Sequence, residues 1–261
     1  MNHGERISVG PLAVDSLTMR EAIHQIRLTA LTRDAKPKMV ATANAQFAQL
    51  AMSNRRFRNI LRDAELVVAD GMSVVMAARL LGQSLPERIA GIDLMSELCG
   101  DAETAGLSVY FLGGRPGAAK KASENLRARF TRLKVAGIDC PRPGFENDAS
   151  ESDAVVRRIA QAAPDILFVG FGAPKQEYWM EDHASALPVK VMIGVGCSFD
   201  VLSGELARAP QGMQRVGMEW VFRLGQEPKR LWRRYLVGNA QFVKAVLWQW
   251  LTERKESWLA S

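Results

Sequence analysis

Ser108-Val-Tyr-Phe-Leu-Gly-Gly-Arg-Pro-Gly117 is the stretch that decides the fold class of this 261-residue chain. Five residues typical of a buried strand lead directly into a glycine-rich turn, and a helical pattern follows from Ala118 to Phe130. Short apolar runs and longer amphipathic runs alternate in the same way on both sides of this stretch. Apolar strands that alternate with helices are typical of a mainly parallel sheet with helices on both faces. The sequence therefore predicts an α/β, Rossmann-like fold.

The same alternation predicts the other elements of the first 200 residues. Gly10-Pro11 separates two short runs, 6–9 and 12–14, and predicts a small N-terminal β-hairpin. Further strands are expected at 39–42, 66–69, 135–138, 166–169 and 189–195. Further helices are expected at 18–31, 45–62, 73–81, 93–105 and 153–162.

The last 56 residues differ in composition from the rest of the chain. They contain seven Arg and three Lys but only four Glu, so they carry the whole formal net charge of +6, and they hold five of the six Trp. Arg and Lys favour anionic lipid head groups, and Trp favours the membrane interface. We therefore expect a catalytic domain over 1–205 and a basic, Trp-rich helical appendage over 206–261 that closes the active site and contacts an anionic membrane surface.

Two helices are expected in this appendage. Pro210 and Pro228 predict their starts, at about 211–224 and 229–251, because proline is tolerated in the first turn of a helix. Five apolar residues recur at roughly helical spacing and are expected to form one stripe, namely Trp232, Leu236, Val243, Leu247 and Trp250.

Cysteine usage and hydropathy predict where the protein works. Cys99, Cys140 and Cys197 are odd in number and widely spaced, which favours a reducing cytoplasm over a disulfide framework. No stretch resembles a signal peptide or a membrane span, so membrane contact is expected to be peripheral, on the inner face of the cell membrane. No His, Cys or carboxylate cluster has metal-ligand spacing, so neither a metal nor a cofactor is expected.

Asp70 is the carboxylate best placed for chemistry. It ends an apolar strand and precedes Gly71, at the edge of the sheet where doubly wound folds bind their ligands. There it could abstract a proton, or it could simply cap the helix at 73–81. Thr42 and Asn44 end the neighbouring strand and could bind substrate or cap the helix after them.

Glycine-rich turns follow three of the predicted strands, at Gly113 and Gly114, at Gly172 and at Gly196. Such turns let backbone N–H groups approach a phosphate, so together they predict a nucleotide-sized anionic ligand, although turn geometry alone could explain each. Arg88 could pair with a phosphate or with a surface carboxylate. Gln176 opens a helix, where capping is the ordinary role.

Several collinear segments together resemble the WecG/TagA/CpsF family of bacterial glycosyltransferases, glycosyltransferase family 26. The resemblance covers about residues 5 to 240, and only Ser73 and Cys197 depart from a frequent glycine. The matching segments are 42–44, 69–75, 87–94, 111–114, 164–177, 194–200, 208–210, 217–220 and 226–235.

The resemblance implies an inverting, metal-independent transfer of a sugar from a UDP-sugar to a polyprenyl-diphosphate-linked sugar. N-acetylmannosamine, its uronic acid and glucose are the sugars considered, in the synthesis of a cell-surface polysaccharide or a teichoic-acid-type glycan. Asp70 is implied as the general base, with Thr42 and Asn44 beside the reacting groups. The implied donor-binding residues are Arg88, Gly113, Gly114, Gly172, Gln176, Gly196 and Asp200. The residues implied to close over the diphosphate are Arg223, Arg230 and Arg233.

Two other classes of protein are weighed against this reading. A nucleotide-dependent oxidoreductase or epimerase would suit the sheet, but the Gly-x-Gly-x-x-Gly fingerprint is missing from the loop at 113–117. A nucleic-acid binder would use the basic appendage, but it would leave the neutral body and its glycine turns without a purpose, so no nucleic-acid partner is expected. The sequence leaves open which sugar and glycan are used and whether the chain forms a homo-oligomer.

Overall fold

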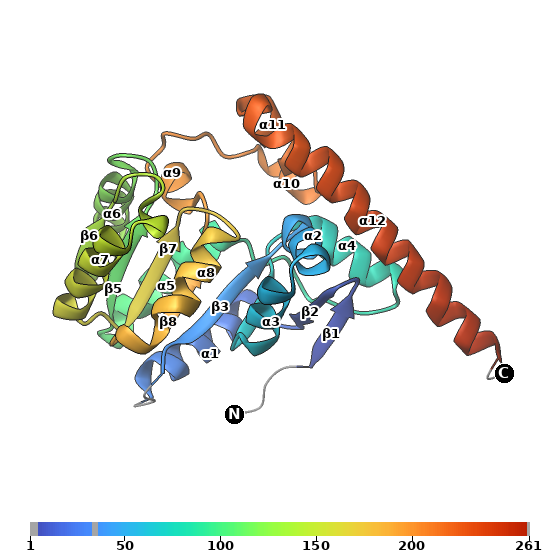
Figure 1. Ribbon diagram of the computed structural model, residues 1–261, viewed down its shortest axis with the longest axis horizontal. Coiled ribbons are helices and arrows are strands. Elements are labelled where there is room, and N and C mark those ends of the chain that lie inside the picture. The colour runs from blue at the N-terminus through green and yellow to red at the C-terminus, as the bar shows by residue number, and fades with distance from the viewer. Residues whose placement is uncertain (1–4, 33–35, 260–261) are drawn as a thin grey trace.

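The computed structural model describes the backbone of residues 5–32 and 36–259, and their side chains except those of 234, 235 and 254–259 (Figure 1). The side chain of Trp258, which belongs to the predicted appendage, therefore lies outside the described part. The strands are β1 Arg6–Val9, β2 Leu12–Asp15, β3 Lys38–Ala43, β4 Leu66–Ala69, β5 Ser108–Gly113, β6 Lys134–Asp139, β7 Ile166–Gly170 and β8 Val191–Gly194.

Twelve α-helices are found in the described residues, with two short 3-10 turns, Phe145–Asn147 and Ala184–Ala186. The first six helices are α1 Met19–Leu31, α2 Ala45–Ser53, α3 Arg55–Asp63, α4 Met72–Leu80, α5 Gly91–Ala105 and α6 Ala118–Arg129. The other six are α7 Ala149–Ala162, α8 Lys175–His183, α9 Ser198–Leu202, α10 Gln211–Arg215, α11 Glu219–Gln226 and α12 Pro228–Leu259.

A six-stranded sheet forms the centre of the protein, in the order β4-β3-β8-β7-β5-β6, and every neighbouring pair is parallel. The antiparallel pair β1 and β2 forms the separate N-terminal hairpin. Helices lie on both faces of the sheet, and α10 to α12 follow its last strand (Figure 1). The predicted parallel α/β sheet, hairpin and helical C-terminus are thus confirmed.

The inner strands of the sheet are largely apolar because both of their faces are buried, whereas the edge strand β6 is partly exposed. In β7, Ile166 and Phe168 pack in the cluster that α1, α5 and α6 cover, whereas Leu167 and Val169 pack in the cluster that α7 and α8 cover. Successive residues of a strand point to opposite faces, so every residue of β7 needs an apolar side chain or none. In strands such as β7, polar groups are therefore expected at the ends.

Two of the predicted helices are each divided in the structure. The expected helix 45–62 breaks at Asn54, which ends α2 and caps α3 by accepting a hydrogen bond from Phe57 N–H at 3.0 Å. The expected helix 211–224 breaks between α10 and α11, where Gly217 adopts a φ of +75°. Both predictions of one continuous helix were wrong, because local capping outweighs the apolar periodicity.

The long helix α12 packs beside the N-terminal hairpin, α2 and α4 (Figure 1). Phe242 and Val246 are buried in the same cluster as hairpin residues, and Gln249 accepts a hydrogen bond from Gly10 N–H at 2.6 Å. Trp250, a member of the predicted stripe, packs against this cluster and is partly buried. The other members of that stripe are exposed, namely Trp232, Leu236, Val243 and Leu247.

Two valines of α12 provide a matched test of this contact. Val246 is 3% exposed and Val243 is 54% exposed. Val246→Ala should lower the free energy of unfolding by about 1.5–2 kcal/mol, since buried methyl groups are lost and a cavity remains. Val243→Ala should change it by less than about 0.5 kcal/mol. Urea unfolding measures both, and equal effects would contradict the described packing of α12.

Candidate active site

Asp70 lies at the carboxyl edge of the sheet, directly after β4. Its Oδ1 accepts a hydrogen bond from the N–H of Gly91, the first residue of α5, at 2.9 Å, and its Oδ2 accepts one from Asn44 Nδ2 at 3.3 Å. Gly71 is the N-cap of α4, and that helix has no side-chain capping bond. Asp70 therefore does not cap α4, which was the alternative left open by the sequence. It meets the N-terminus of α5, where the peptide dipoles favour a negative charge.

The surroundings of Asp70 raise its pKa. Burial is the largest cause, while the hydrogen bonds from Gly91 and Asn44 oppose it. Two charges from further away also act on this carboxyl group, since Glu219 raises its pKa and Arg88 lowers it. A carboxylate with a raised pKa is a stronger base than an ordinary one, and general bases in enzymes are tuned in this way.

Asn44 and Thr42 lie at the end of β3, the strand next to β4. Asn44 is the N-cap of α2 through a bond from Gln46 N–H to Oδ1 at 3.0 Å, so the same side chain caps a helix and holds Asp70. Thr42 is buried, and its Oγ1 donates to the carbonyl oxygen of Gly194 at 2.9 Å. A Cβ atom on Gly91 would lie 3.4 Å from the Thr42 side chain, so Thr42 and the Asp70 partner Gly91 are adjacent.

Gln176 joins the turns that follow β7 and β8. Its side chain is buried, and Oε1 accepts hydrogen bonds from Gly172 N–H at 3.0 Å and from Gly196 N–H at 3.2 Å. Its Nε2 donates to Glu177 Oε1 at 2.7 Å. Gln176 thus fixes the shape of two glycine turns at the edge of the sheet.

Gly113 and Gly114 allow close packing at the end of β5. Both have positive φ angles, and a Cβ on Gly113 would lie only 2.8 Å from the carbonyl oxygen of Gly170. The first residue after them, Arg115, donates its N–H to Asp200 Oδ1 at 2.9 Å. Gly114 lies against the Phe199 side chain, where a Cβ atom would come within 3.1 Å, and Asp200 binds the backbone of Arg115. Close packing in the turn therefore accounts for the contacts of both glycines.

Arg88 connects the Asp70 end of the site to the appendage. Its Nη1 donates to Glu219 Oε2 in α11 at 2.6 Å, and its Nη2 donates to Gln214 Oε1 in α10 at 3.2 Å. The ion pair is largely shielded from water on the arginine side. The sequence suggested a phosphate or a surface carboxylate as the partner, and the structure shows a carboxylate from the C-terminal segment.

Helix α11 also contacts the turns after β8 and β5. Arg223 Nη1 donates to Cys197 Sγ at 2.7 Å, and Arg115 Nη2 donates to Glu227 Oε1, just after α11, at 2.7 Å. Since β4 and β5 lie on opposite sides of β8 in the sheet, these contacts and the Arg88 pair place α11 across its carboxyl edge (Figure 1).

The other two arginines assigned to the appendage have different surroundings. Arg230 is exposed and pairs with Glu227 at 2.6 Å, so it lies beside Arg223. Arg233 is also exposed and lies over the ring of Trp232, with 5.2 Å between its guanidinium carbon and the ring centroid. The described contacts bring Arg223 and Arg230 together on one carboxylate but leave Arg233 on the outer surface of α12.

Sequence reasoning missed Glu219, Glu227 and Arg115. Residues 206–261 contain only four acidic residues, and these two glutamates are half of them. An acidic residue in such a basic segment could have been expected to form a specific ion pair. Arg115 lies between Gly114 and Gly117 in the turn after β5. The glycine pattern predicts backbone contacts there and gives no sign of a role for the arginine side chain.

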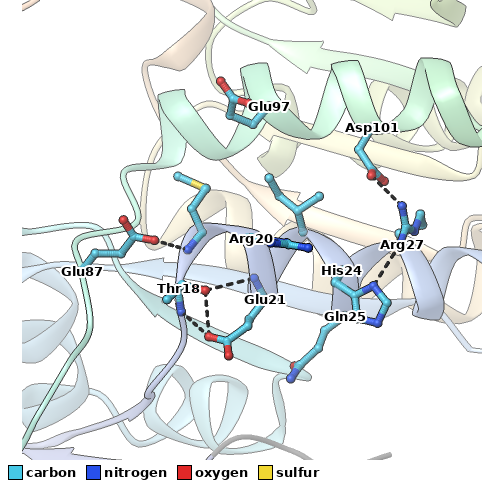
Figure 2. A pocket seen from close by; sticks show the side chains of 11 residues that line it. Thr18, Arg20, Glu21, His24, Gln25, Arg27, Glu87, Glu97 and Asp101 are labelled. Atoms are coloured by element: carbon cyan, nitrogen blue, oxygen red, sulfur yellow. Dashed lines mark hydrogen bonds and ion pairs between the residues drawn. The ribbon is translucent and has the colours of Figure 1, made fainter.

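A groove beside α1 and α5 has no residue in common with this site (Figure 2). Several of its polar side chains bond to one another or to backbone, for example Arg27 to Asp101 at 2.9 Å and Glu21 to the N–H of Thr18 at 2.8 Å. These bonds fasten α1 to α5 and cap α1. No cluster of His, Cys, Asp or Glu that could hold a metal ion is found among residues 5–32 and 36–259.

Comparison with known proteins gives the class of the protein. The profile of the Glycosyl transferase WecG/TagA/CpsF family matches residues 7–256. A relative from Bacillus spizizenii is 35% identical over 212 residues, 81% of this chain and 79% of the relative. One from Bacillus subtilis is 34% identical over 76% of this chain and 75% of its own. One from Staphylococcus aureus is 32% identical over 84% of both.

All three relatives are named N-acetylglucosaminyldiphosphoundecaprenol N-acetyl-beta-D-mannosaminyltransferase. The protein is a glycosyltransferase, so the oxidoreductase and nucleic-acid-binding alternatives are set aside. It belongs to the WecG/TagA/CpsF family, as the matching segments indicated.

The hydrogen bond from Asn44 to Asp70 is expected to influence the pH below which transferase activity is lost. Asn44→Ser keeps a good N-cap for α2 but removes the donor that lowers the pKa of Asp70. The pKa should rise, so transferase activity should be lost at a higher pH than in the wild type. Asn54→Ser changes an equivalent cap on α3 and is the control. A pH profile of kcat/KM that is the same in both variants would disprove the link.

Proposed function

We propose that the protein transfers a sugar from a UDP-sugar to a polyprenyl-diphosphate-linked sugar, with inversion and without a metal ion. The position of Asp70 carries this proposal, because its carboxylate is held at the sheet edge by two donors while burial raises its pKa. In this reading residues 1–205 form the catalytic domain, and residues 206–261 form an appendage that covers the site.

In the proposed reaction Asp70 accepts the proton of the acceptor hydroxyl group. The hydroxyl oxygen attacks the anomeric carbon of the donor, and the bond from that carbon to the diphosphate oxygen breaks. The electron pair leaves with UDP, and the new glycosidic bond has the opposite anomeric configuration. Thr42 and Asn44 lie next to Asp70 and its partner Gly91, so they are placed beside the reacting groups.

The leaving UDP carries negative charge that cationic side chains can stabilise. Arg223 and Arg230 lie together at the carboxyl edge and are the proposed partners of the diphosphate. Arg88 lies near enough to Asp70 to act on its pKa, and we assign it to the donor end of the site. Arg233 would need to leave its position over Trp232 to join them.

Backbone turns would shape the rest of the donor site. The proposed donor-binding residues are Gly113, Gly114, Gly172, Gln176, Gly196 and Asp200. Gln176 acts here by holding the N–H groups of two turns in place, since its own polar atoms are already bonded within the protein.

The names of the relatives narrow the choice of sugar and acceptor. They describe transfer of N-acetyl-β-D-mannosamine to N-acetylglucosaminyl-diphospho-undecaprenol. We propose the same pair for this protein, ahead of the uronic acid or glucose. A β-linked product is also what inversion gives from an α-linked UDP-sugar.

The lipid part of this acceptor requires the enzyme to work at a membrane surface. No helix of the described residues is long and apolar enough to cross a membrane. Exposed apolar side chains instead lie along the outer side of α12, beside basic residues, and we propose that they contact the anionic inner face of the cell membrane. These side chains are Trp232, Leu236, Val237, Val243, Leu247, Trp248 and Leu251.

Replacement of Asp70 tests the base directly. Asp70→Asn should lower the turnover of UDP-N-acetylmannosamine by about 10²-fold or more, because proton abstraction is lost. UDP affinity should stay close to that of the wild type. Asp63→Asn makes the same change in an exposed carboxylate and is the control. Release of UDP in the presence of a prenyl-diphosphate acceptor measures turnover, and an Asp70→Asn enzyme with half of the normal rate would rule out this base.

Leu247 and Leu28 test the membrane surface with a matched pair. They are 45% and 41% exposed, on α12 and α1 respectively. Leu247→Ser should weaken binding to anionic lipid vesicles by about threefold to tenfold, since less apolar area enters the interface. Leu28→Ser should not change it. Vesicle co-sedimentation gives both affinities, and equal effects would argue against α12 as the contact.

A further inference from the structure

One carboxylate, that of Glu227, receives three arginines from separate segments of the chain. Arg115, from the turn after β5, contacts its Oε1 at 2.7 Å. Arg223 of α11 and Arg230 of α12 contact its Oε2 at 3.5 Å and 2.6 Å. The Glu227 side chain is only 15% exposed. We call these three arginines the arginine cluster.

The three positive charges of the arginine cluster exceed the single negative charge of Glu227. Asp200 is a second acid near it, with its Oδ2 3.8 Å from Arg115 Nε. Among the described ion pairs, Glu227 contacts all three arginines, and Asp200 contacts Arg115 alone. Guanidinium forks bind phosphate oxygens as readily as carboxylate oxygens, and a diphosphate offers more oxygens and more charge than one carboxylate.

The arginine cluster lies beside two of the glycine turns that are assigned to donor binding under the proposed function. Arg223 also contacts Cys197, which follows the glycine turn after β8, and Arg115 belongs to the glycine turn after β5. Arg230 is exposed, and the side chain of Arg115 is partly exposed, so an anion from solution can reach both. An anion that bound there would compete with Glu227 for the same guanidinium groups.

We propose that Glu227 is an internal counter-ion, which holds the arginine cluster until the diphosphate of the UDP-sugar displaces it. Arg115 is then a diphosphate-binding residue, together with Arg223 and Arg230. The inference rests on the proposed function, because it takes UDP as the leaving group. Its physical consequence is that Glu227 weakens UDP binding and so favours release of the product.

Calorimetry with UDP and with inorganic pyrophosphate tests the competition. Glu227→Gln removes the competing charge with little change of shape, so both ligands should bind about fivefold more tightly than to the wild type. Glu253→Gln removes one negative charge from an exposed site on α12 and should change neither affinity. Arg115→Gln should weaken both ligands by about fivefold to tenfold.

Equal or weaker UDP binding by folded Glu227→Gln protein would overturn the proposal, since Glu227 would then orient the arginines instead of competing for them. Circular dichroism and thermal unfolding establish that the variant is folded. If it is not, an Arg115→Gln enzyme with unchanged pyrophosphate affinity overturns the proposal by itself. Sugar transfer by the wild type is measured separately, so a failure of the proposed function is distinguished from a failure of this inference.

Discussion

Burial of the central sheet on both faces, at every strand but the edge strand β6, is the constraint on which the rest of this structure depends. All four residues of β4 are buried, so the first position where the chain can carry a charge is the one after it, Asp70. Parallel pairing places the end of β3 beside this position, and α5 begins opposite it. The carboxylate of Asp70, the amide of Asn44 and the N-terminus of α5 therefore lie together in space although they are far apart in the sequence.

The same geometry sets the electrostatics of the carboxylate. Burial destabilises the charged form of Asp70, and the hydrogen bonds from Gly91 and Asn44 partly stabilise it. Glu219 and Arg88 act in opposite directions, and one of them belongs to the C-terminal segment. A side chain of α11 thus contributes to the raised pKa of Asp70, after burial and the two hydrogen bonds, and this contribution connects the appendage to the proposed chemistry.

Much of the architecture was predictable from the sequence, because short apolar runs such as Ile166–Gly170, set between helical patterns, are typical of strands buried on both sides. Breaks inside helices were harder to predict. Asn54 and Gly217 interrupt helical patterns at positions where periodicity alone gives no sign of an end. Four members of the apolar stripe expected on α12 are exposed, whereas Trp250 is partly buried because it packs against the cluster that includes residues of the N-terminal hairpin.

The sequence by itself determined the fold class, the family and the group of residues at the strand ends, because these follow from local patterns and from motifs along the chain. Only the tertiary structure decided which side chains meet. Glu219 reaches Arg88, and Glu227 reaches Arg115, across 131 and 112 positions of sequence. The physical reason is that such ion pairs depend on how α11 lies against the sheet edge, and that placement results from packing between distant segments, which no local pattern records.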